Sequence, residues 1–257
     1  MIANYHAHTT RCNHATGTER EYVEAAIQRG LKIFGFSDHT PQYFPGGYCT
    51  FMRMRTHELP EYCMEVRKLQ REYKDQIQVR LGLEVEYYPA IWRDLLMRAQ
   101  DSGVEYMILG QHFTNNEYDG AYCGSKTNQD QEIRDYVRQC MEAMNTGLYT
   151  YVAHPDVMRH AGDPKRYKEI MRHLCKEANS CGMPLEINLL GLRENKWYPQ
   201  MPFLEACGEE NCKMILGIDA HNPQCLNDPV TEGIARELVK TYGLKLVDRV
   251  ELRPIHL

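Results

Sequence analysis

Short runs of β-branched and aromatic residues alternate along the chain with longer amphipathic segments. Apolar runs of four to eight residues bounded by turn residues are typical of buried strands, and a 3.6-residue apolar period indicates helices. The pattern predicts strands at residues 2–5, 31–36, 77–83, 106–109, 148–153, 185–188 and 213–218, with a candidate edge strand at 245–251. It predicts helices near 18–29, 57–74, 90–101, 129–145, 164–181, 199–210 and 229–242.

Residues at the predicted helix ends support these boundaries. Thr18 and Glu21 have the spacing of a capping box, and Asp163 and Asp228 each precede a proline at a first helical position. Glycine follows most of the helical runs, where a left-handed residue closes a helix. These glycines are Gly30, Gly103, Gly147, Gly182 and Gly243.

The alternation of strand and helix, about seven times over, predicts an α/β protein with a parallel sheet covered by helices. No stretch rich in Gly, Pro or Ser divides the chain, so we expect one domain over residues 1–257. Periodicity does not choose between an open doubly wound sheet and a closed barrel. Both architectures build their functional sites at the carboxyl ends of the strands.

Composition narrows the function classes. The net charge of −5 counts weakly against a nucleic-acid partner, whose binding needs clustered Lys and Arg. The chain begins without a charged, apolar leader, and its apolar runs fall far short of the ~20 residues of a membrane span. We therefore expect a cytoplasmic protein without a membrane partner. The ten cysteines include no C-x2-C pair and are expected to be reduced packing residues.

Histidines and carboxylates gather where the predicted strands end. Residues two apart on an extended segment face the same side, so His6 and His8 can converge on one ion, as can Asp219 and His221. Four other histidines, His57, His160, His173 and His256, lie in helical or terminal segments and are interpreted as ordinary. The strand-end set is His6, His8, His14, His39, Glu84, His112, His154, Asp219 and His221.

Such a concentration of polar groups on one face is costly unless cations hold it. Imidazole and carboxylate ligands without thiolate suit Zn²⁺, Mn²⁺ or Fe²⁺, and nine ligands fit two or three ions that share a bridging carboxylate. Multinuclear sites of this kind are typically hydrolytic. The sequence has no Gly-x-Ser-x-Gly elbow and no phosphate loop, which favours a metal-bound hydroxide as nucleophile.

These motifs, in this order along the chain, resemble the polymerase and histidinol phosphatase (PHP) family. They are His6-x-His8, Ser37-Asp38-His39, Glu84, Gly110-Gln-His112, His154-Pro and Asp219-x-His221. The segment from Cys12 to Glu19 and the following helix look most like the histidinol-phosphatase branch. The resemblance implies a distorted (β/α)7 TIM-like barrel with a trinuclear site.

Carried over to this chain, the resemblance assigns His6, His8, Glu84 and Asp219 to one ion. A second ion would share Glu84 and add His112 and His154, and a third would take His14, His39 and His221. Glu84 and His221 are the side chains assigned to catalysis, beside the bridging hydroxide. Asp38 is assigned to orienting a ligand imidazole.

The implied reaction is hydrolysis of a small phosphate monoester, L-histidinol phosphate, to L-histidinol and phosphate, as in histidine biosynthesis. Arg159 and Arg193 lie in loops on the same face, where a guanidinium suits a phosphate. Glu117 and Asp119 are candidate partners for the substrate amine, although a solvated polar turn is the simpler interpretation of that segment.

Three alternatives remain open at this point. The chain could be another PHP phosphoesterase, such as a phosphodiesterase or a nucleotide-end exonuclease. It could be an amidohydrolase, although Glu84 then stands where a modified lysine is usual. It could also be a metal-binding module without catalysis, but none of the nine ligand positions is lost.

Overall fold

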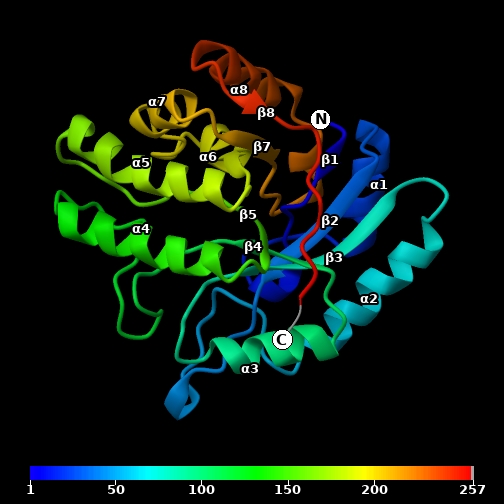
Figure 1. The fold of residues 1–257 in the computed structure, drawn as a ribbon. Helices are drawn as coiled ribbons and strands as arrows, with labels where there is room; N and C mark the ends of the chain where they lie inside the picture. The colour runs from blue at the N-terminus through cyan, green and yellow to red at the C-terminus, as the bar shows by residue number, and fades with distance from the viewer. Residues whose placement is uncertain (256–257) are drawn as a thin grey trace.

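The computed structural model describes residues 1–255 and shows a curled parallel sheet covered by helices (Figure 1). Eight parallel strands pair in chain order, from β1 to β8. The predicted strands are confirmed, with ends shifted by a few residues. Their bounds are β1 Ala3–Asn4, β2 Ile33–His39, β3 Gln78–Val85, β4 Tyr106–Leu109, β5 Tyr149–Val152, β6 Leu185–Asn188, β7 Lys213–Gly217 and β8 Lys245–Leu246.

The seven predicted helices are also confirmed, and one short helix is added. Thr18 forms the full capping box with Glu21, and the Asp163 and Asp228 side chains cap their helices as expected. The added helix has five residues, too few for an amphipathic period to show. The helices are α1 Glu19–Arg29, α2 Leu59–Glu72, α3 Trp92–Asp101, α4 Asp130–Asn145, α5 Pro164–Ser180, α6 Leu189–Arg193, α7 Met201–Glu209 and α8 Pro229–Thr241.

The sheet closes between its first and seventh strands. Just beyond β1 and β7, Ala7 and Ala220 form a parallel bridge, in which the His8 backbone N–H donates to the Ala220 carbonyl at 2.9 Å. The short β8 pairs with the start of β7, at the opposite end of the barrel. The expected barrel of seven strands is therefore confirmed, with β8 as an additional strand.

Strand residues alternate between the helices and the barrel interior. In β3, Leu81, Leu83 and Val85 join the large core beneath the helices, while Gly82 and Glu84 face inward. A separate apolar cluster fills the lower interior, and residues Val247, Val250 and Leu252 of the C-terminal segment pack against it. That segment is the red trace that crosses the strands in Figure 1. The inner cluster comprises Ala3, Tyr5, Tyr106, Ile108, Tyr151, Ala153 and Ile215.

Two further expectations concern the whole chain. Seven of the ten cysteines are buried, in line with packing roles, and Cys49 is exposed. Among the described residues, no helix has the length and apolar character needed to cross a membrane. His256 lies outside the described residues.

Candidate metal centre

The nine strand-end residues come together at the carboxyl end of the barrel. His39 ends β2 and Glu84 lies in β3, while the other seven lie on the segments that follow β1, β4, β5 and β7. Seven of the nine line a cavity of about 320 Å³, and His6 and His8 lie fully buried beneath it. The seven are His14, His39, Glu84, His112, His154, Asp219 and His221.

Glu84 is the centre of this group. Its Oε1 lies 2.7 Å from His154 Nε2 and 3.7 Å from His112 Nε2. Its Oε2 lies 3.0 Å from His39 Nδ1 and 3.6 Å from His8 Nε2. One carboxylate therefore faces imidazoles on both sides, which is the arrangement of a bridging ligand.

Asp219 forms the other acidic corner. Its Oδ1 lies 3.1 Å from His8 Nε2, 3.5 Å from His6 Nε2 and 3.4 Å from His221 Nδ1. Asp219 and His154 adopt positive φ angles of 51° and 29°, which non-glycine residues rarely do. Backbone strain of this kind persists where the surrounding structure holds a side chain in a functional position.

Several buried ligand atoms in this centre have no hydrogen-bond partner among residues 1–255. They are His6 Nε2, His8 Nε2, Glu84 Oε2 and Asp219 Oδ1. A buried polar atom without a partner costs about 1–3 kcal/mol, and here several of them point at one another. Divalent cations would satisfy all of these atoms, so the donor set fits the metal ions expected from the sequence.

Carboxylates ionise readily in this centre, and despite burial their charge raises the pKa of His6, His8 and His112, whose protons metal binding would displace. Burial opposes ionisation of Glu84 and Asp219, but the surrounding imidazoles hold the pKa of each carboxyl well below its usual range. Burial and neighbouring imidazoles lower the pKa of His39 to about 4 and that of His221 well below its usual value. The carboxylates are therefore ionised and these two imidazoles neutral, which is the state in which they bind metals.

A second ring of carboxylates supports the imidazoles. Glu186 Oε1 lies 2.9 Å from His6 Nδ1, and its Oε2 accepts the His154 backbone N–H at 2.8 Å. Asp38 lies 3.5 Å from His8 Nδ1, in the place assigned to it. Such partners fix the orientation and tautomer of a ligand imidazole.

Sequence reasoning missed two members of this ring, Glu186 and Glu86. Glu86 lies 3.2 Å from His112 Nδ1 and is paired with the buried guanidinium of Arg53. A signal was present for both, because a glutamate inside an apolar strand, or two residues beyond a strand-end ligand, faces the barrel interior.

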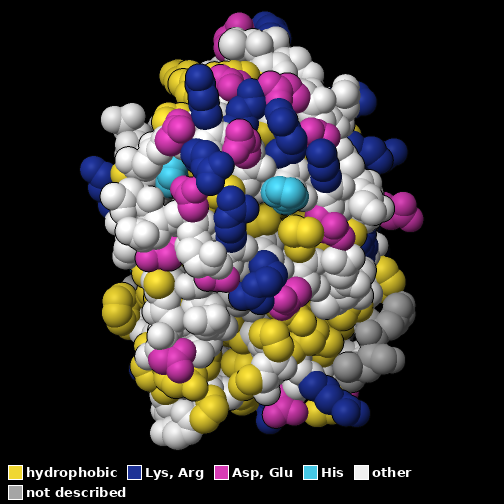
Figure 2. Space-filling view, turned by 60° about the vertical axis from the view of Figure 1, so that its left-hand side comes forward, with side chains coloured by type: hydrophobic (Ala, Val, Ile, Leu, Met, Phe, Trp, Pro, Cys, Tyr) yellow, Lys and Arg dark blue, Asp and Glu magenta, His cyan; other side chains and the backbone are white. Residues whose placement is uncertain are grey.

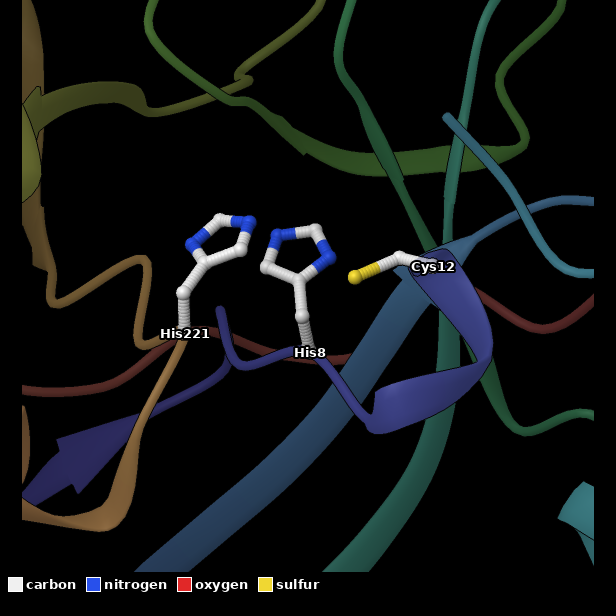
Figure 3. Close-up of side chains that lie close together, drawn as sticks. All are labelled: His8, Cys12 and His221. Atoms are coloured by element: carbon white, nitrogen blue, oxygen red, sulfur yellow. The ribbon is translucent and has the colours of Figure 1, made fainter. Parts of the chain in front are cut away.

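Cys12 lies beside His8 and His221, next to the histidines assigned to the third ion. Figure 3 shows its sulfur directed at the His8 ring, with His221 on the other side of that ring. The His8 and His221 rings stack with centroids 4.2 Å apart. Burial raises the pKa of the Cys12 thiol, so this side chain stays neutral beside the histidines. The sequence had placed Cys12 among the packing residues, and its position was not foreseen.

Comparison with known proteins identifies the family. The PHP domain model matches residues 4–189. A probable histidinol-phosphatase of Deinococcus radiodurans is 30% identical over 230 residues, which cover 86% of this chain and 87% of that protein. The chain belongs to the PHP domain family.

Other relatives of this PHP protein agree with the assignment. A probable histidinol-phosphatase of Schizosaccharomyces pombe is 26% identical over 269 residues, covering 94% of this chain and 86% of the relative. The crystal structure of histidinol phosphate phosphatase from Lactococcus lactis, complexed with Zn, L-histidinol and phosphate, superposes with a TM-score of 0.72. It shares 22% identity and covers 100% of this chain and 99% of the other, which establishes a common fold.

The two arginines expected at the phosphate differ in their surroundings in this PHP domain. Neither lines the cavity. Arg159 is exposed, and its guanidinium lies 4.9 Å from the centre of the Trp197 ring. Arg193 ends α6 instead of lying in a loop, and its two terminal nitrogens are buried without a hydrogen-bond partner.

The acidic turn after β4 places neither of its carboxylates in the lining of the cavity. Glu117 is buried and paired with Arg53, with Oε2 2.8 Å from the guanidinium Nε. Asp119 bonds to Asn116 within the turn. The cavity wall instead carries Glu194 and Lys196, whose charged groups lie 3.1 Å apart. These two residues were not predicted, because they follow the short helix α6 that the pattern missed.

Proposed function

We propose that this PHP domain hydrolyses L-histidinol phosphate to L-histidinol and phosphate, using two to three divalent ions of Zn²⁺, Mn²⁺ or Fe²⁺. The observation that carries the proposal is the set of buried, unpaired ligand atoms on the floor of the cavity. Relatives that align over most of the chain are named histidinol-phosphatases, and the L. lactis protein was crystallised with the two products.

We assign the ligands to three ions as the family resemblance implies. His6, His8, Glu84 and Asp219 would hold one ion, and Glu84, His112 and His154 a second. His14, His39 and His221 have ligand atoms within 4.8 Å of one another and would hold a third. Ions bound there would supply positive charge for the phosphoryl oxygens and acidify water for attack on phosphorus.

The protein side chains would position the ions and the substrate. Glu84 would fix the spacing of two ions, because imidazoles lie on both sides of its carboxylate. His221, which lines the cavity, would act in catalysis as a ligand of the third ion, and because its lowered pKa leaves it neutral, the proton for the departing alkoxide would come from water. Arg193 would bind a phosphoryl oxygen, since its buried nitrogens lack a partner, and Arg159 would contact the phosphate from the rim.

The amine of histidinol needs a carboxylate. Glu194 replaces Glu117 in that proposed role, because Glu194 lines the cavity whereas Arg53 already neutralises Glu117. Lys196, which pairs with Glu194, would add a cation to the same wall of the cavity.

We also propose that the PHP domain extends over residues 1–257. The family model ends at residue 189, yet β7 and the segment after it close the barrel and contribute Asp219 and His221. A small phosphate ester as sole substrate, without a nucleic-acid or membrane partner, and a cytoplasmic location remain part of the proposal. The net charge of −5 supports it.

Phosphate release tests the function. Purified protein is stripped with a chelator, reloaded with Mn²⁺ or Zn²⁺, and assayed with histidinol phosphate, p-nitrophenyl phosphate and a dinucleotide. We expect release from histidinol phosphate to be the fastest by at least about tenfold and to depend on metal. Equal rates on all three substrates would refute the substrate assignment within the family, and no release from any would favour a non-catalytic metal-binding module.

A further inference from the structure

Three cysteines that are distant in sequence converge between α5, α7 and the start of β7. Cys175 lies in α5, Cys207 in α7, and Cys212 in the turn that leads into β7. The Cys175 and Cys207 sulfurs are 3.7 Å apart, and all three sulfurs lie within 4.8 Å of one another. All three residues are at most 1% exposed.

The backbone holds this group in place. The Cys212 N–H donates to the Cys207 carbonyl at 2.9 Å, which turns the chain after α7 back toward its own last turn. The Cys212 thiol lies 3.7 Å from the Cys175 carbonyl. Backbone and side-chain contacts therefore hold the three sulfurs close together. The buried Cys63 in α2, by contrast, has no hydrogen bond to another sulfur among the described residues.

The spacing suits a metal. Two sulfurs bound at ~2.3 Å to one tetrahedral ion lie ~3.8 Å apart, close to the separation of Cys175 and Cys207. Soft thiolate ligands select ions such as Zn²⁺ over Mg²⁺ or Ca²⁺.

The surroundings leave such a site covered. Charged side chains of both signs cover the outer face of α4, α5 and α7 (Figure 2). Among them, Lys168 and Arg172 of α5 pair with Glu209 of α7. Arg172 lies one turn before Cys175, and its Nε is 3.1 Å from Glu210.

We propose that Cys175, Cys207 and Cys212 form a second metal site, a three-thiolate site for a thiophilic divalent ion such as Zn²⁺, separate from the histidine and carboxylate centre. Binding releases the thiol protons to solvent and involves no redox change. The bound ion ties α5 and α7 to the start of β7, the strand that leads to Asp219.

Cobalt substitution tests this site, because Co²⁺ bound to thiolate gives a near-ultraviolet charge-transfer band that imidazole and carboxylate ligands do not give. Reduced, chelator-stripped protein is titrated anaerobically with Co²⁺. We expect the band in the wild-type protein, its loss in Cys207→Ser and Cys175→Ser, and its displacement by Zn²⁺. Cys63→Ser is the matched control for loss of a buried thiol, and Cys12→Ser separates this site from the thiol beside His8.

The result has clear alternatives. A wild-type protein without the band, while Co²⁺ fills the histidine centre, would overturn the proposal, as would a band that persists in Cys207→Ser or disappears in Cys12→Ser. Far-UV circular dichroism of each variant confirms folding. If a serine variant does not fold, titration of the wild-type protein blocked at its thiols with a reversible reagent provides the same readout. None of these results depends on phosphatase activity.

Discussion

The barrel interior has two layers that meet different demands. The lower layer is the apolar cluster around Tyr5, Tyr106 and Tyr151, and the hydroxyls of these tyrosines have hydrogen-bond partners. The Tyr106 hydroxyl donates to the Tyr5 carbonyl at 2.8 Å and lies 3.0 Å from the Phe36 carbonyl. The upper layer, at the carboxyl ends of the strands, holds the nine proposed ligands, and several of its buried atoms have no partner. The lower layer is thus complete within the protein, whereas the upper layer is completed by cations.

Glycines shape both layers. A Cβ on Gly35 or Gly82 would lie within 2.3 Å of the Tyr106 side chain, so these glycines admit the tyrosine ring. A Cβ on Gly110 would lie 1.9 Å from Glu84 Oε1, and one on Gly217 would lie 1.7 Å from Glu186 Oε1. The same device therefore makes room for packing in one layer and for the carboxylates of the metal centre in the other. The layers should therefore differ in their response to substitution. Substitutions in the upper layer should reduce activity, and substitutions in the lower layer should reduce stability.

The largest effect is expected for Glu84→Gln in the upper layer. The amide keeps the size of the side chain but loses the charge that faces imidazoles on both sides. We expect kcat to fall by about 10³-fold, with metal content reduced and the fold retained. Steady-state kinetics and metal analysis measure both quantities. Full activity in this variant would remove Glu84 from its bridging position.

Glu186→Gln should have a smaller effect on the same layer. Glu186 touches the ligands but is not placed on an ion, and it holds His6 through the ring Nδ1. We expect metal affinity or activity to fall by about 10- to 100-fold. Glu169→Gln, on the exposed surface of α5, is the matched control. If both variants titrate metal with wild-type affinity, Glu186 has no orienting role.

Tyr106→Phe tests the lower layer. The substitution leaves two buried carbonyls without the hydroxyl, and we expect a loss of about 1–3 kcal/mol in the free energy of unfolding with kcat unchanged. Tyr22→Phe is the control, because the Tyr22 hydroxyl is buried without a partner, and its removal should not destabilise the protein. Urea unfolding and kinetics provide the two measurements. A large loss of kcat in Tyr106→Phe would contradict the separation of the two layers.

Much of this architecture was predictable from sequence, because strand and helix periods are local. The caps at Thr18, Asp163 and Asp228 fixed helix starts within a residue or two. Closure of the barrel was not predictable from periodicity, since it depends on the bridge between Ala7 and Ala220, residues far apart in the chain. The barrel was expected only from the resemblance to the PHP family.

The site divides in the same way. Strand-end position is a local property, and it identified nine residues that lie together, seven of them in the lining of one cavity and two beneath it. The supporting carboxylates depend on which strand lies opposite, so Glu186 was overlooked although it contacts both His6 and His154. Convergence of Cys175, Cys207 and Cys212 depends on helix packing, so their spacing in the sequence does not predict it.

The smallest effects are expected for Arg193 and Arg159, and they test whether substrate binding extends beyond the lining of the cavity. Arg193→Ala removes a guanidinium whose buried nitrogens lack a partner, and Arg159→Ala removes an exposed one that lies over Trp197. If phosphate is the missing partner of Arg193, the kcat/KM of the Arg193→Ala variant for histidinol phosphate should fall about tenfold, or ~1.4 kcal/mol, with bound metal unchanged. Arg159→Ala should lose less, because an exposed ion contact is weakened by solvent. Wild-type kcat/KM values in both variants would show that the two arginines have no part in holding phosphate. Substrate binding would then be confined to the cavity wall, where Lys196 is the remaining cation.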